Sequence, residues 1–116
     1  MGKELKTTYF ANVKKLGDMN FVSIARKTPD GFPGLIYSPL APTQEILDGY
    51  KYGNKSKKWY IEKYVDDVLA YLSPQDVINI VGDDAVFCCY ETPEKFCHRH
   101  IVAKWFERAG FEIKEI

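Results

Sequence analysis

The C-terminal part of the chain constrains the fold more than any other segment. Residues 85–90 (AVFCCY) are apolar without alternation, as expected of a strand that is covered on both faces. An amphipathic segment follows at 92–110, with Thr92 and Pro93 as its predicted N-cap and first-turn proline. Residues 111–116 alternate in polarity, which indicates another strand. A strand, a helix and a strand in this order predict parallel pairing, because the connection must cross one face of the sheet.

Further strands and helices are predicted upstream. Residues 7–11 and 20–25 are rich in β-forming side chains and are bounded by turn residues. Helices are predicted at 44–50, 56–72 and 75–80 from their start signals and apolar spacing. In the longest of them, the spacing predicts a buried face made of Ile61, Val65, Val68 and Leu72. The whole pattern predicts a small α/β domain, Rossmann-like and three-layered, with a mostly parallel sheet and helices on its faces.

Residues 27–42 are predicted to form a long loop within that domain. Proline and glycine are too dense in this segment for a continuous helix or a central strand. Two interpretations stay open, a binding loop over a site and a structural loop that packs Phe32, Leu35 and Tyr37 on the core.

Length and charge limit the classes of function. A chain of 116 residues predicts one domain over residues 1–116, large enough for a core without metal or disulfide support. Its 16 basic and 16 acidic residues balance, so the general attraction of a nucleic-acid or membrane-surface binder is missing. We therefore expect neither nucleic acid nor membrane as a partner, and any site for a small anionic ligand must be local. The sequence does not indicate an oligomeric state.

The cellular compartment is predicted from the apolar segments and the cysteines. The chain has no apolar stretch long enough to span a bilayer, and MGKELKTTYF lacks the apolar core of a signal peptide. Both observations predict a cytoplasmic protein. A reducing compartment would keep Cys88, Cys89 and Cys97 as thiols, so we expect no structural disulfide.

Reactive side chains gather after two of the predicted strands. Ligands of parallel sheets bind beyond the carboxyl ends of the strands. Residues 23–26 (SIAR) follow one strand and Glu91 follows another, and Cys97, His98 and Arg99 lie in the early turns of the last helix. The sequence therefore predicts a site where these segments converge.

The segment YETPEKFCHRHIVAKWF resembles the signature of the domain-of-unknown-function family 488, in which an apolar strand ends in Cys-x-Glu and Cys-His-Arg opens the last helix. The resemblance covers nearly the whole chain, because TYFAN, SIAR and YSPLAP also resemble segments of the shorter members. It implies an α/β fold and a site at Glu91, Cys97, His98 and Arg99, without an established reaction. Longer members carry an aspartate shortly before the arginine that matches Arg26, and this chain has none there.

Cys97, His98 and Glu91 are the candidate catalytic residues. A thiol near a helix N-terminus and beside cations favours the thiolate, which suits nucleophilic or redox chemistry. The alternative is a core thiol, because Cys97 shares one helical face with Ile101 and Trp105. His98 is a candidate general base and, equally, a core histidine with its hydrogen bonds satisfied.

Arg99, Arg26, Ser23 and Tyr37 are the candidate substrate-binding residues. A guanidinium beside the free N–H groups of a helix N-terminus gives bidentate recognition of phosphate or carboxylate. The alternative is an ion pair of Glu91 with Arg99 or Arg26 that holds the turn without any ligand.

We predict no metal site and identify no cofactor from the sequence. Cys88, Cys89, Cys97, His98 and His100 supply enough soft donor atoms for zinc. Their spacing differs from that of structural zinc sites, and adjacent cysteines of a strand point to opposite faces. His100 is predicted to be solvated.

Two hypotheses remain open at this point. The first is a small enzyme that binds a phosphate- or nucleotide-like anion at the Cys-His-Arg turn. The second is a non-catalytic ligand- or protein-binding module, in which the same side chains hold the turn together.

Overall fold

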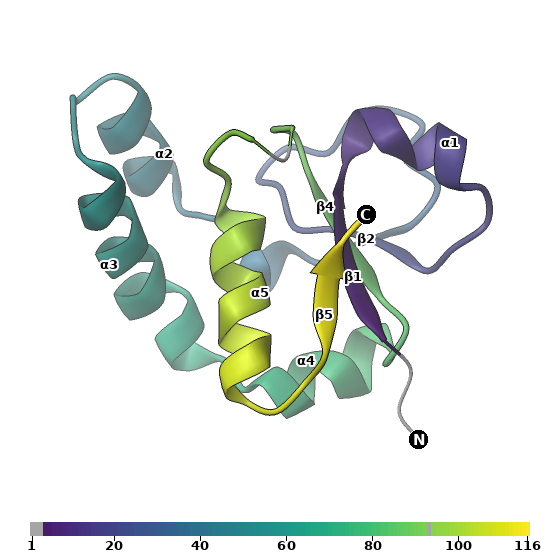
Figure 1. Ribbon diagram of the computed structural model, residues 1–116. Helices are drawn as coiled ribbons and strands as arrows, with labels where there is room; N and C mark the ends of the chain where they lie inside the picture. The colour runs from purple at the N-terminus through teal and green to yellow at the C-terminus, as the bar shows by residue number, and fades with distance from the viewer. Residues whose placement is uncertain (1–3, 93) are drawn as a thin grey trace.

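The computed structural model describes residues 4–92 and 94–116, and they are organised around one five-stranded sheet (Figure 1). The strand order is β3-β2-β4-β1-β5, and every neighbouring pair is parallel. The parallel sheet with helices packed on it confirms the predicted α/β class. The strands are β1 (Leu5–Tyr9), β2 (Phe21–Ser23), β3 (Leu35–Ile36), β4 (Val86–Cys89) and β5 (Ile113–Glu115).

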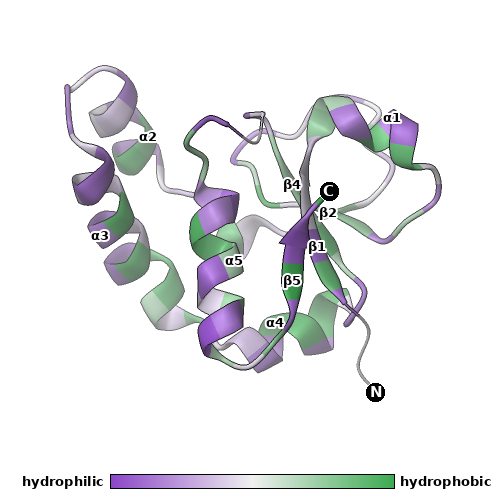
Figure 2. Ribbon diagram, in the orientation of Figure 1, coloured by the Kyte–Doolittle hydropathy of each residue, from purple (hydrophilic) through white to green (hydrophobic). Residues whose placement is uncertain are grey.

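Helices cover both faces of this sheet. Four of them gather around the larger hydrophobic cluster: α2 (Gln44–Lys51), α3 (Lys57–Asp67), α4 (Pro74–Val81) and α5 (His98–Arg108). On the opposite face, α1 (Val13–Leu16) packs on a smaller cluster. Short 3-10 turns are η1 (Phe10–Asn12), η2 (Ser38–Leu40) and η3 (Leu69–Tyr71). The helices carry both hydrophobic and hydrophilic residues, as amphipathic helices on a sheet do (Figure 2).

Strand β4 lies at the centre of the sheet and is buried on both faces, as its apolar sequence predicts. Its residues alternate between the two clusters, because successive side chains of a strand point to opposite faces. Val86 and Cys88 pack with the α1 side, whereas Phe87 packs with the larger cluster. The Phe87 ring stacks on Phe106 of α5 at 5.2 Å between ring centroids.

The predicted buried face of the helix at 56–72 is right only in part: Val68 is buried and Leu72 packs partly buried against the core, but the positions within α3 itself are wrong. Tyr60 and Tyr64 face the core, whereas Ile61 and Val65 are 40% and 39% exposed. Two aromatic rings bury more apolar surface than two aliphatic side chains, and the Tyr64 hydroxyl also finds a buried acceptor. It donates to the carbonyl oxygen of Leu40 at 2.5 Å. Within α3, the core therefore contains Tyr60 and Tyr64 instead of Ile61 and Val65.

The predicted start of the last helix is also wrong. Helix α5 begins at His98, and Cys97 occupies its N-cap. The Thr92 hydroxyl donates to the carboxylate of Glu94 instead of capping a helix, and Pro93 lies outside the described residues. The segment before α5 forms a turn, which brings Cys97 closer to β4 than a longer helix would.

The segment 27–42 contains the short edge strand β3 and the η2 turn. The interpretation as a structural loop holds in part, and the interpretation as a binding loop stays a prediction. Tyr37 is buried and Phe32 is partly buried against the α1 side, whereas Leu35 is exposed. None of the helices within residues 4–92 and 94–116 has the length and apolar character needed to cross a membrane.

Candidate functional site

The candidate site lies where β2 and β4 end beside the start of α5. The two strands are parallel neighbours, so their carboxyl ends meet at one edge of the sheet. Ile24 and Ala25 continue from β2, and Tyr90 and Glu91 continue from β4. The backbone turn before α5 places the helix N-terminus over this edge (Figure 1). The predicted convergence of the two segments is therefore present in the fold.

An open cleft of about 1130 Å³ covers this edge. Ala25 and Arg26 line it from β2, Cys89 to Glu91 from β4, and Phe96 to His98 from α5. The C-terminal end of α2 and the loop after it form the facing wall. Among the described residues, the charged lining side chains are four bases and two acids: Arg26, Lys27, Lys51, Lys55, Asp48 and Glu91.

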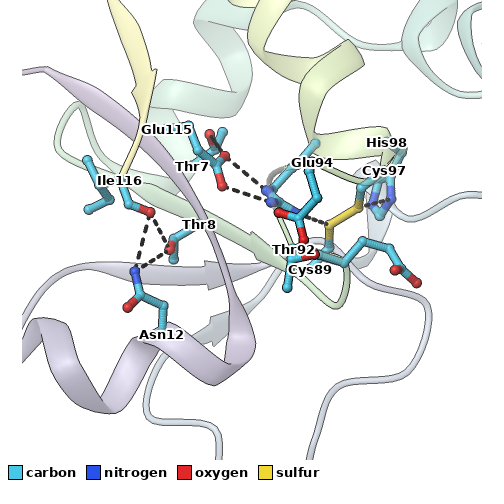
Figure 3. Close-up of polar contacts among 12 residues, drawn as sticks. Thr7, Thr8, Asn12, Cys89, Thr92, Glu94, Cys97, His98, Glu115 and Ile116 are labelled. Carbon is cyan, nitrogen blue, oxygen red and sulfur yellow. Dashed lines mark hydrogen bonds and ion pairs between the residues drawn. A yellow bond between two sulfur atoms is a disulfide. The ribbon is translucent and has the colours of Figure 1, made fainter.

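Cys89 and Cys97 form a disulfide at the floor of the cleft (Figure 3). The expectation of no disulfide is therefore wrong. The last residue of β4 and the N-cap of α5 meet at the same sheet edge, so cysteines eight positions apart become neighbours. Cys88 points to the opposite face, as predicted, and remains a free buried thiol. Burial raises the pKa of Cys88 to about 12, so it stays protonated.

His98 connects the helix start to the end of β2. Its Nε2 lies 2.6 Å from the carbonyl oxygen of Ile24. A carbonyl oxygen can only accept, so Nε2 carries the proton and Nδ1 keeps a lone pair. Nδ1 lies 3.7 Å from the sulfur of Cys97. Burial is the main cause that lowers the pKa of His98 to about 4, and the charge of Arg99 contributes, so this imidazole is neutral near pH 7.

Arg99 is fully buried and holds the floor of the site together. Its Nε and NH2 groups donate to the two carboxylate oxygens of Glu115, at 3.0 and 2.8 Å. Its NH1 group donates to the carbonyl oxygen of Glu91 at 2.6 Å and to the sulfur of Cys89 at 3.1 Å. The ion pair of Arg99 thus runs to Glu115, whereas Glu91 contributes its backbone carbonyl.

Glu115 is the partner that the sequence interpretation missed. Thr7 of β1 also donates to its carboxylate, so this residue ties β1, β5 and α5 together (Figure 3). Burial alone would raise the pKa of Glu115, but hydrogen bonds from Arg99 and Thr7 lower it overall. The signal was present, because an acid two positions after Ile113 lies on the inward face of an alternating strand.

The remaining predicted site residues are dispersed. Arg26 lines the cleft and donates from Nε to the side chain of Gln44 at 2.9 Å. Ser23 is buried at the end of β2, where its hydroxyl lies 2.7 Å from that of Thr28. Tyr37 is buried and is not among the residues that line the cleft. Burial and the charge of Asp76 raise the pKa of Tyr37.

His100 differs from its prediction as a solvated side chain. It is partly buried, and its Nε2 atom is enclosed without a hydrogen-bond partner among the described residues. Burial and the charge of Arg99 lower the pKa of His100.

Comparison with known proteins identifies the family of the chain. The family model DUF488-N3a, described as the active DUF488-N3 subclade, matches residues 5–110. This match includes β1, the cleft and the Cys-His-Arg turn. Neither a curated protein nor a solved structure matches the chain. With nearly its whole length matched, the chain belongs to the DUF488 family, in its DUF488-N3a subclade.

Proposed function

We propose that this protein is a small cytoplasmic enzyme that acts on a phosphate- or nucleotide-like anion in the cleft. The anion contacts the basic wall, and the reactive end of the substrate lies at the floor, beside Cys97. The observation that carries the proposal is the concentration of basic groups and sulfur donors in one cleft at the carboxyl ends of β2 and β4.

The local charge of the cleft supports an anionic ligand. The whole chain has a formal net charge of zero, yet basic side chains outnumber acidic ones two to one among the described lining residues. Arg26 uses Nε for Gln44, and its two terminal nitrogens have no recorded partner among the described residues. A guanidinium in this state can bind two phosphate oxygens at once. Arg26 is therefore the proposed principal anion contact.

The floor of the cleft supports chemistry rather than binding alone. Cys97, His98 and Glu91 line it and are the proposed catalytic residues. Cys97 occupies the N-cap position of α5, where the helix dipole and free N–H groups stabilise a thiolate when the cysteine is reduced. Arg99 is proposed as a positioning residue, because it is fully buried and its Nε, NH1 and NH2 groups all donate to Glu115, Glu91 or Cys89.

Replacing Arg26 with alanine is expected to weaken the binding of pyrophosphate about tenfold, the loss of roughly 1.4 kcal/mol that one charge-assisted hydrogen bond supplies. Isothermal titration calorimetry of the reduced protein measures this directly. The matched control is Lys14→Ala, which removes a positive charge from α1 on the other face of the sheet. Raising the salt concentration should weaken pyrophosphate binding to the wild type more than to Arg26→Ala.

Two results would contradict the proposal that this protein is an enzyme acting on an anion in the cleft. Equal affinities of the wild type and Arg26→Ala for pyrophosphate would show that the anion does not occupy this cleft. Anion binding with an inert Cys97 would instead favour the second hypothesis, a non-catalytic binding module in which Cys97, His98 and Arg99 maintain the turn.

A further inference from the structure

Three soft donor atoms meet at the floor of the cleft. The ligand atoms of Cys89, Cys97 and His98 all lie within 4.8 Å of one another. The three side chains are buried, and they come from the end of β4 and the start of α5. Two sulfurs and an imidazole are a donor set that suits zinc and other soft divalent metals.

We propose that the reduced protein binds one Zn²⁺ ion through Cys89 Sγ, Cys97 Sγ and His98 Nδ1, with the fourth coordination position open to the cleft. The inference deepens the proposed function and rests on it for the role of the open position. There the metal would hold a water molecule or an oxygen of the anion. Cys97 then serves as a metal ligand at the reactive end of the site.

The spacing of the Cys97 and His98 donors fits one metal ion, and the two sulfurs, which are bonded to each other, separate on reduction. Zinc bonds of about 2.3 Å to sulfur and about 2.0 Å to nitrogen place the two donors roughly 3.5 Å apart in a tetrahedral site. The observed distance between Cys97 Sγ and His98 Nδ1 is 3.7 Å. The Cα atoms of Cys89 and Cys97 are 7.4 Å apart. Disulfides usually span about 4.4–6.8 Å between Cα atoms, so this backbone spacing leaves room for an ion between two sulfurs.

The surroundings already prepare the donors for a metal. His98 donates from Nε2 to the carbonyl of Ile24, which fixes the ring and turns the Nδ1 lone pair toward Cys97. A backbone carbonyl on the other ring nitrogen is the usual support of a metal-bound histidine. The guanidinium of Arg99, 3.1 Å from Cys89 Sγ, would offset the negative charge of two thiolates.

The metal and the disulfide are alternative states of the same cysteines. A dithiol reductant supplies two electrons and two protons to the disulfide, and it becomes a cyclic disulfide itself. Zn²⁺ binding then releases the two thiol protons, so that both sulfurs coordinate as thiolates. The sequence showed these donors but argued against a metal site, because two of the ligands are adjacent and the third lies eight positions upstream, unlike the spacing of structural zinc sites.

The test is a Co²⁺ titration of the reduced, metal-free protein, followed by competition with Zn²⁺ and a chromophoric chelator. We expect one Co²⁺ per chain, with thiolate charge-transfer absorption and the visible bands of a tetrahedral ion, both displaced by Zn²⁺. Cys97→Ser and His98→Gln should each weaken binding at least about tenfold. Cys88→Ser is the matched control, because this neighbouring buried thiol points to the other face and should leave binding unchanged.

Circular dichroism of each variant separates a lost ligand from a lost fold. Octahedral cobalt bands, the absence of thiolate charge transfer, or equal loss in Cys88→Ser would overturn the metal site. Pyrophosphate binding is measured separately in the presence of a chelator. If it persists and depends on Arg26 while Co²⁺ does not bind, the metal site fails alone; if Co²⁺ binds and pyrophosphate does not, the proposed substrate fails.

Discussion

Replacing Arg99 with alanine is expected to lower the free energy of unfolding by about 3 kcal/mol, the usual scale for removing one partner of a buried ion pair. The change leaves the carboxylate of Glu115 without its guanidinium and the carbonyl of Glu91 without its donor. It also leaves space at a site where the arginine side chain is fully buried. Equilibrium unfolding in urea at pH 7 measures the loss.

Two further variants test whether the loss of stability in Arg99→Ala comes from the buried ion pair. Lys58→Ala removes one partner of an exposed ion pair with Glu62 and should leave the urea midpoint close to that of the wild type. Glu115→Gln keeps the shape of the acceptor but leaves the fully buried guanidinium of Arg99 without its counter-charge, so it should also lower the free energy of unfolding. An Arg99→Ala protein as stable as the Lys58→Ala control would contradict the structural role of this network.

Acidification is expected to cost the protein about 3 kcal/mol between pH 6.5 and pH 4, through His98 alone. The pKa of His98 is about 4 in the folded protein and about 6.5 when unfolded. Between these values the unfolded chain binds the proton and the folded one does not, so stability falls as the pH falls. The full contribution is present above pH 6.5 and is lost as the pH approaches 4. Urea unfolding at several pH values across this window measures the slope.

His98→Gln is the variant that tests this assignment, because it removes the titration and keeps a side chain that can donate to Ile24. Its stability should vary less with pH between 6.5 and 4 than that of the wild type. The pKa of His100 is also lowered, so His100→Gln is the matched control and should flatten the profile less. Equal slopes in the wild type and His98→Gln would show that His98 is not the group responsible.

The sheet and the convergence of the segments around the candidate site could be predicted from the sequence because they depend on local patterns. The unbroken apolar run at 85–90 indicated a strand buried on both faces, and the order strand, helix, strand indicated parallel pairing. Parallel neighbours must end at the same edge, so Ile24 and Glu91 were expected to lie close together. His98 and Arg99 join these two segments through the backbone carbonyls of Ile24 and Glu91.

The contacts within the site could not be predicted, because they depend on the three-dimensional geometry of the turn before α5. Thr92 and Pro93 form a good helix start signal, yet the helix begins at His98. This later start makes Cys97 the N-cap and brings it to Cys89, which periodicity alone does not indicate. Arg99 pairs with Glu115 rather than with Glu91, because β5 adds a strand next to β1 and carries the acid inward.

The buried face of α3 could not be predicted from residue spacing alone. Aliphatic and aromatic residues on this helix both recur at helical intervals, so two faces were possible. The structure buries Tyr60 and Tyr64, and the edge of the Tyr60 ring meets Phe96 at the wall of the cleft. Phe96, the aromatic partner of Tyr60, lies in the turn before α5 and 36 positions along the chain, so the spacing within α3 does not indicate this contact.

The most direct test of the proposed active site is the protection of Cys97 from alkylation by a bound anion. Iodoacetamide is added to the reduced, chelator-treated protein, and the modification of each cysteine is followed by mass spectrometry with and without saturating pyrophosphate. We expect Cys97 to react in the folded protein while Cys88 does not, and we expect pyrophosphate to slow the reaction in the wild type but not in Arg26→Ala. A Cys97 that reacts only on unfolding, or at the same rate with and without pyrophosphate, would contradict an active site in this cleft.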